Sequence, residues 1–222
     1  MNLLDIIGPV MVGPSSSHTA GAVKIGNACR KLLGEELTSA EILFHGSFLA
    51  TGKGHGTDKA IVAGLLGYAV DDIKIPQSFE LAKEAGLSFS ISGIDLGDVH
   101  PNSVKMILTG KSGRIIEVIA ASIGAGRIQI CELDGQTVNF SGESPTLIVR
   151  HQDIPGRVTK VTSLLEFTSV NIGGMQLYRD SRGGHAVMVI ECDQEVPNET
   201  LALLRKLEGI EKVIYFSLSG GQ

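Results

Sequence analysis

The last third of the sequence, residues 146–222, constrains the fold more than any other feature. Four of its runs have the composition of β-strands: TLIVR (146–150), VNIGGMQLYR (170–179), HAVMVIEC (185–192) and KVIYFSL (212–218). Two stretches between them carry apolar residues at helical spacing, with Val158, Val161, Leu165 and Thr168 in the first and Leu201, Leu204 and Leu207 in the second. The resulting order β-α-β-β-α-β is the split βαβ pattern of ferredoxin-like domains.

The start of the first of these helices carries a local signal of its own. Asp153 precedes Pro155 and Gly156, and an Asp before a Pro is typical of a helix N-cap followed by the first turn. We therefore predict that Asp153 caps this helix.

The polar stretch SGESP (141–145) marks a boundary, so we expect two domains, residues 1–143 and 146–222. The first domain is less regular. We expect helices at 19–33 and 57–70, the second rich in small residues that allow close packing. A strand is predicted at 41–45, and strands separated by glycine turns over 103–140. Both parts together indicate a mixed α/β (α+β) fold.

Composition excludes several classes of function. The chain has 222 residues, a net charge of −5 and only 5% aromatic residues, without a basic stripe, so nucleic-acid binding is not expected. We find no signal peptide and no apolar run of the roughly 18 residues that a membrane helix needs, and therefore expect a cytoplasmic protein without membrane contact. The cysteines at 29, 131 and 192 are scattered, whereas zinc or iron–sulfur sites use about four grouped ligands, so we predict no metal site in this chain.

Two short stretches place a histidine among glycines and hydroxyl residues: GPSSSHTAG (13–21) and TGKGHGTD (51–58). Glycines let a backbone approach a small ligand, and the amide groups at the start of a following helix attract an anion. The side chains of Ser15, Ser16, Ser17 and Thr19 add hydroxyl groups. The second stretch does not match the phosphate-binding pattern GxxxxGK[ST], because Gly54 follows the lysine.

His18 and His55 are the candidate proton carriers of these stretches. An imidazole titrates near neutral pH and so can take or give a proton. The alternative is that each is a loop or capping histidine without a chemical role. The sequence read residue by residue leaves both possibilities open.

Two long blocks, DIIGPVMVGPSSSHTAGAVKIG (5–26) and HGSFLATGKGHGTDKAIVAGLLG (45–67), together with HPNS (100–103) and the C-terminal segment, resemble the β subunit of bacterial iron–sulfur-dependent L-serine dehydratases. The first half is also similar to the allosteric substrate-binding domain of some phosphoglycerate dehydrogenases. The C-terminal segment looks like an ACT domain, a small-molecule sensing module. The resemblance implies the elimination of L-serine to pyruvate and ammonia without pyridoxal phosphate.

The resemblance also implies a division of labour. A [4Fe–4S] cluster held by a separate α subunit would act as a Lewis acid on the substrate hydroxyl, with potassium as a possible activator. This chain would be inactive alone and would self-associate through its ACT domain. His55 is implied as the general base and His18 as a supporting residue. Ser15, Ser16, Ser17, Thr19, Lys53 and Asp58 are implied as substrate contacts, and His151, Asp153 and Asn171 as a possible ACT ligand site.

One rival function belongs to a different class. The chain could be a regulatory subunit that senses an amino acid and takes no part in chemistry, with its histidines serving only to bind. A dehydrogenase fragment is disfavoured, because the sequence has no dinucleotide-binding loop.

Overall fold

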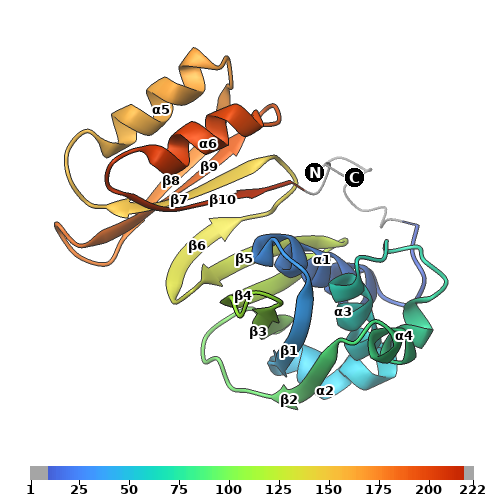
Figure 1. Cartoon of the computed structure of the whole chain (residues 1–222). Helices are drawn as coiled ribbons and strands as arrows, with labels where there is room; N and C mark the ends of the chain where they lie inside the picture. Colours follow the sequence, from blue (N-terminus) through green and yellow to red (C-terminus); the bar gives the residue numbers. More distant parts are fainter. Residues whose placement is uncertain (1–9, 218–222) are drawn as a thin grey trace. The chain divides into compact units, whose positions relative to one another are not determined.

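The computed structural model describes residues 10–217 (Figure 1). The chain divides into two compact units, residues 1–135 and 136–222. Each unit has its own sheet, which agrees with the mixed α/β class expected from the sequence. The prediction for the last strand extends to Leu218, which lies outside the described residues.

The first unit is built on a sheet of mixed direction. Its strands are β1 (Leu37–Phe44), β2 (Ser88–Gly93), β3 (Ser103–Gly110), β4 (Ile115–Gly124) and β5 (Arg127–Leu133). The order of these strands in the sheet is β2-β1-β3-β4-β5, in which β1 and β2 run parallel and the pairs β1–β3, β3–β4 and β4–β5 run antiparallel. β2 is therefore an edge strand, and the crossover from β1 to β2 carries the helices between residues 46 and 84.

The helices of the first unit begin with a five-residue π-turn, η2 (Ser16–Ala20), which runs directly into α1 (Gly21–Leu33). The crossover then contains α2 (Gly46–His55), α3 (Thr57–Leu66), the short 3₁₀ turn η3 (Ile75–Gln77) and α4 (Ser78–Glu84). Helix α1 packs on β3, β4 and β5 and against α3 (Figure 1).

Small residues set the distance between α1 and α3, as the sequence predicted. A Cβ atom on Gly26 would lie 2.4 Å from the carbonyl oxygen of Ile61, and one on Gly64 would lie 2.1 Å from that of Val23. Both contacts are far too short for a carbon atom, so only glycine permits this backbone approach. The predicted helix 57–70 ends early, at Leu66, because Gly67 adopts a left-handed conformation with φ +92° and closes the helix.

The second unit contains β6 (Gln136–Phe140), β7 (Thr146–Gln152), α5 (Arg157–Phe167), β8 (Ile172–Arg179), β9 (His185–Cys192), α6 (Asn198–Lys206) and β10 (Ile210–Phe216). The four-stranded antiparallel sheet has the order β10-β7-β9-β8. This is the ferredoxin-like arrangement that the β-α-β-β-α-β pattern predicts. The helices cover a core that includes Leu147, Val149, Leu165, Met188 and Leu204.

The observed boundary between the units lies before strand β6, whereas the predicted boundary lies after it. The compact units divide after Gly135, whereas the polar stretch 141–145 follows β6. β6 contacts β8 and β9 and therefore clusters with the second unit. No helix within residues 10–217 is long and apolar enough to cross a membrane.

Candidate active site

The second histidine stretch forms a helical corner, whereas the sequence predicted a helix only from residue 57 onward. The segment 46–55 is helix α2, and His55 is its last residue. Gly56 then takes φ +67°, a left-handed conformation that glycine adopts without strain, and α3 begins at Thr57. The glycines at 52 and 54 therefore lie inside a helix. The sequence contained a signal for this helix that we did not use: Ser47, Thr51 and His55 recur at a spacing of four.

The first histidine stretch is also helical rather than an open loop. Ser15 is extended, and its Oγ accepts a hydrogen bond from the backbone N–H of His18 at 3.0 Å, as an N-cap does. The chain then turns through η2 into α1. The amide groups at this helix start are partly used, because the N–H of Thr19 donates to the Ser15 carbonyl at 2.9 Å. Ser16 and Ser17 are half-buried, and their side chains make no hydrogen bond within residues 10–217.

The fold brings the two stretches together. The rings of His18 and His55 lie 4.9 Å apart between centroids, tilted by 40°. Thr19 ties the two segments, because its buried hydroxyl donates to the carbonyl oxygen of His55 at 3.2 Å. Phe48 closes one side of the cluster with its ring 5.3 Å from that of His18. Two residues that are 37 positions apart in sequence thus form one half-exposed imidazole pair.

Helix α2 supplies the hydroxyl groups that hold His18. Its Nε2 atom lies 3.1 Å from Ser47 Oγ and 3.0 Å from Thr51 Oγ1. The Thr51 hydroxyl donates its single proton to the carbonyl of Ser47 at 2.9 Å. Because a hydroxyl carries only one proton, Thr51 then accepts from His18, which assigns the proton of His18 to Nε2. Ser47 and Thr51 are site residues that the sequence reading missed.

The position of His55 assigns its tautomer as well. Its Nδ1 atom lies 3.1 Å from the carbonyl oxygen of Thr51. A carbonyl oxygen only accepts, so Nδ1 carries the proton and Nε2 of the neutral ring has a free lone pair. The geometry therefore leaves His55 with an unprotonated nitrogen that can accept a proton.

His18 is held in its neutral form. Burial, followed by the neighbouring imidazole of His55, holds the pKa of His18 below its ordinary value of 6.5, and a hydrogen bond with the Ser47 backbone acts in the opposite direction. At neutral pH this ring is therefore a hydrogen-bonding group without charge.

Lys53 and Asp58 do not join the histidine pair. Lys53 lies two residues from Thr51 on α2 and therefore points to a different side of the helix. Together with Asp58 it lines a separate small pocket beside β2, described below. The remaining histidines of this unit are structural: His45 Nδ1 accepts from the backbone N–H of Leu96, and His100 Nδ1 accepts from that of Asn102.

The residues predicted to form a ligand site in the second unit are engaged in internal contacts. Asp153 does not cap α5, because the residue before the helix is Gly156 at φ +86°. Instead its Oδ2 accepts from the Gly183 N–H at 3.1 Å and from Arg179 at 3.2 Å. These contacts, led by the Gly183 amide, hold the pKa of Asp153 below its usual value.

His151 and Asn171 also form hydrogen bonds within the second unit. His151 is buried, and its Nδ1 donates to the carbonyl of Gln152 at 2.8 Å. Asn171 bonds to Asp193 and to Gln194. The structure thus places Asn171 against the segment that follows β9, and Asp153 against the β8–β9 turn.

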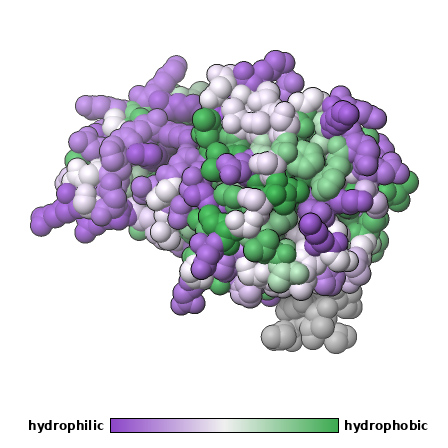
Figure 2. Space-filling model, turned by 90° about the horizontal axis from the view of Figure 1, so that it is seen from below, coloured by the Kyte–Doolittle hydropathy of each residue, from purple (hydrophilic) through white to green (hydrophobic). Residues whose placement is uncertain are grey.

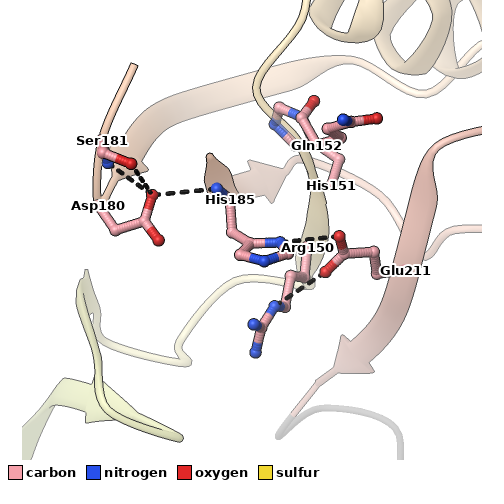
Figure 3. A network of polar contacts seen from close by, with 7 residues as sticks. All are labelled: Arg150, His151, Gln152, Asp180, Ser181, His185 and Glu211. Atoms are coloured by element: carbon pink, nitrogen blue, oxygen red, sulfur yellow. Dashed lines mark hydrogen bonds and ion pairs between the residues drawn. The ribbon is translucent and has the colours of Figure 1, made fainter. Parts of the chain in front are cut away.

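A polar cluster orders the adjoining strand ends (Figure 3). Glu211 of β10 accepts from Arg150 of β7 at 3.1 Å and pairs with His185 of β9 at 2.8 Å. Glu211 lies at the register shift between β10 and β7. Asp180 accepts from the backbone N–H of His185 at 3.0 Å. His185 is therefore a structural residue in this unit.

The three cysteines are free thiols. Cys29 and Cys192 are buried, and no group of three potential metal-binding side chains occurs within residues 10–217. Burial raises the pKa of all three thiols, that of Cys192 to about 11, so they are protonated at neutral pH. A thiol that keeps its proton is a poor metal ligand.

The sequence is similar to curated proteins over nearly its whole length. Residues 3–93 match the family described as serine dehydratase beta chain. The "Probable L-serine dehydratase, beta chain" of Bacillus subtilis is 41% identical over 96% of each chain. The "L-serine dehydratase, beta chain" of Peptoniphilus asaccharolyticus is 39% identical over 94% of this chain and 93% of the relative.

A more distant likeness extends to another class of enzyme. The D-3-phosphoglycerate dehydrogenase of Methanocaldococcus jannaschii is 27% identical over 89% of this chain, but only 37% of that enzyme is covered. The similarity at full length to the two beta chains decides the assignment, and the chain belongs to the L-serine dehydratase beta chain family.

Proposed function

We propose that this chain is the β subunit of an L-serine dehydratase and supplies one wall of an active site completed by an α subunit. The observation that carries the proposal is the His18–His55 pair, half-exposed at the corner between α2 and α3 and surrounded by hydroxyl groups. The two full-length relatives named as beta chains of this enzyme support the reaction class. In the proposed reaction L-serine yields pyruvate and ammonia.

His55 is the proposed general base. Its Nε2 lone pair would take the Cα proton of L-serine, while the electrons of that C–H bond form the Cα=Cβ bond. The Cβ–O bond breaks, and the departing hydroxyl group takes up a proton and leaves as water. The resulting aminoacrylate hydrolyses to pyruvate and ammonia. The bond from Nδ1 to the Thr51 carbonyl orients the ring and stabilises the imidazolium that forms.

His18 and the serine residues are proposed to hold the substrate. His18 is fixed through Nε2 by α2, which leaves its Nδ1 lone pair to accept a hydrogen bond from a ligand. Ser16 and Ser17 offer hydroxyls that no described group occupies, suited to a carboxylate. Ser15 and Thr19 contribute indirectly, since both hydroxyls support the backbone of the histidines.

The cofactor is proposed to belong to the α subunit. The separated, protonated cysteines of this chain do not fit a [4Fe–4S] ligand set, so no step of the reaction is assigned to a cluster here. A potassium site, if the enzyme uses one, is likewise not assigned to residues of this chain.

The second unit is proposed to pair with a second copy of itself. Its helices leave Phe167 83% exposed and Leu203 47% exposed beside a groove of about 810 Å³ between α5 and α6. Large apolar side chains exposed together are typical of interaction surfaces. Phe167→Lys and Leu203→Lys are expected to lower the oligomeric state measured by light scattering. An unchanged state in both variants would contradict self-association through this groove.

The decisive experiment measures anaerobic pyruvate formation from L-serine by this chain alone, by the α subunit alone and by the mixture. We expect activity only in the mixture. Full activity of the α subunit alone would overturn the catalytic role and favour the rival function, a regulatory subunit that senses an amino acid.

A further inference from the structure

A small pocket beside α2 shares Phe48 with the histidine pair but is lined by neither histidine. It has a volume of about 210 Å³ and lies where the parallel strands β1 and β2 end. Six side chains that matter to its chemistry line it: Phe44, Phe48, Leu49, Lys53, Asp58 and Ser92. Figure 2 views the molecule from the side on which Figure 1 draws β2 and α2, and apolar and polar residues meet on this face.

The position of the pocket is one that commonly serves binding. In open α/β sheets, ligands bind in the crevice beyond the carboxyl ends of parallel strands. β1 ends at Phe44 and β2 at Gly93, and the two residues are register partners. The first turn of α2 does not supply an anion site here, because the N–H groups of Ser47 and Phe48 both donate to the carbonyl of Pro101.

The size of the pocket limits its ligand. Pockets for drug-sized molecules measure roughly 300–1,000 Å³. A volume of about 210 Å³ is therefore too small for a nucleotide and suits a metabolite of a few heavy atoms.

The charges of the pocket point to a zwitterion. Lys53 brings one positive charge from α2, and Asp58 brings one negative charge from the first turn of α3. Lys53 forms no ion pair with any residue between 10 and 217, and Asp58 uses one oxygen to accept the N–H of Lys59 at 2.8 Å. A ligand with a carboxylate and an ammonium group would match both charges at once, whereas a simple anion would be repelled by Asp58.

The rest of the lining favours an amino acid with a small side chain. Phe44 and Phe48, whose rings meet edge to face at 5.8 Å, form an apolar wall. Ser92 is exposed near the end of β2 and offers a hydroxyl beside this wall. We propose that the Lys53–Asp58 pocket binds a free, small α-amino acid, with its carboxylate at Lys53 and its ammonium group at Asp58, at a site separate from the histidine pair.

The test is a binding measurement on the full chain without the α subunit, so that its failure is distinct from a failure of the proposed function. Glycine and L-alanine are titrated while backbone amide signals are followed by NMR, with acetate and methylamine as single-charge probes. We expect the two amino acids to shift the signals of Lys53, Asp58 and Ser92, and the single-charge probes to bind at least tenfold more weakly.

Variants locate the site. Lys53→Met and Asp58→Asn are each expected to weaken L-alanine binding at least tenfold. Well-dispersed amide signals in each variant would show that it remains folded. His55→Gln and Lys83→Met, a change of an exposed lysine on α4, are expected to leave it unchanged. Equal binding of acetate and L-alanine would overturn the proposal, as would loss of binding in His55→Gln or the absence of any binding.

Discussion

The two units place similar residues in opposite situations. In the first unit, His18 and His55 face each other at a half-exposed corner, and each ring keeps one nitrogen without a partner among residues 10–217. In the second unit, the Nε2 atom of His151 also has no partner among the described residues, but the ring is buried. The carboxylate of Asp153 is taken by Arg179 and by a backbone amide. Residue type alone therefore does not make a site, because a polar group can bind a ligand only where the fold leaves it both unsatisfied and accessible.

Substituting one histidine in each unit is expected to give the largest difference in kcat between the two units. His55→Gln is expected to lower kcat of the mixed enzyme by about 10²–10⁴, since this is the usual contribution of a general base. His151→Gln is expected to leave kcat near its original value. Pyruvate formation measured at saturating L-serine, with the melting temperature of each variant, tests this. Equal losses in both variants would remove the distinction between the units.

Two threonines, one in each unit, allow a second comparison with a moderate expected effect on kcat. Thr51 and Thr162 both lie in helices and donate to the carbonyl four residues earlier, but only Thr51 also contacts a site histidine. Thr51→Val is expected to lower kcat by about 3–10-fold, the loss of one hydrogen bond. Thr162→Val, the matched control, is expected to change stability alone. A full kcat in Thr51→Val would show that His18 needs no such support.

The acid stability of the second unit offers a smaller test. The folded state lowers the pKa of Asp153 below 3.8, so its contacts stabilise the fold above that pH and the contribution is lost as the pH falls through the folded pKa. Asp153→Asn is therefore expected to be less stable than the parent chain at pH 5–7, with the difference shrinking below pH 3.8. Urea midpoints across this range measure it. A difference that stays constant would mean that the carboxylate charge is irrelevant.

The smallest expected effect is on the pH dependence of stability in the first unit, and it falls in a different pH range. The pKa of His18 is lowered in the folded state, so the unfolded chain binds more protons and the parent chain loses stability as the pH falls below about 6.5. His18→Gln is expected to lack this part of the decline. The urea midpoint of each chain between pH 7.5 and pH 5 is the measurement, and parallel curves would refute the expectation.

Much of the fold could be predicted, because the periodicity of apolar residues indicates its strands and helices. The strands at 103–110 and 185–192 and the helix at 197–207 occur where their apolar periodicity places them, within a residue or two. Helix α2 was missed, because its glycines at 52 and 54 lower helix propensity and concealed the spacing of Ser47, Thr51 and His55. Tertiary contacts, including the Pro101 carbonyl at its first turn, stabilise a helix that propensity alone disfavours.

Short-range spacing along the chain encodes the residue types of the site, the two-part organisation and the ferredoxin-like order of the second unit. Which of these residues meet depends on the tertiary fold. It joined His18 to His55 through Thr19 and α2, separated Lys53 and Asp58 into a pocket of their own, and engaged Asp153 internally. The physical reason is that partnership and burial depend on contacts between distant segments, which no local pattern records.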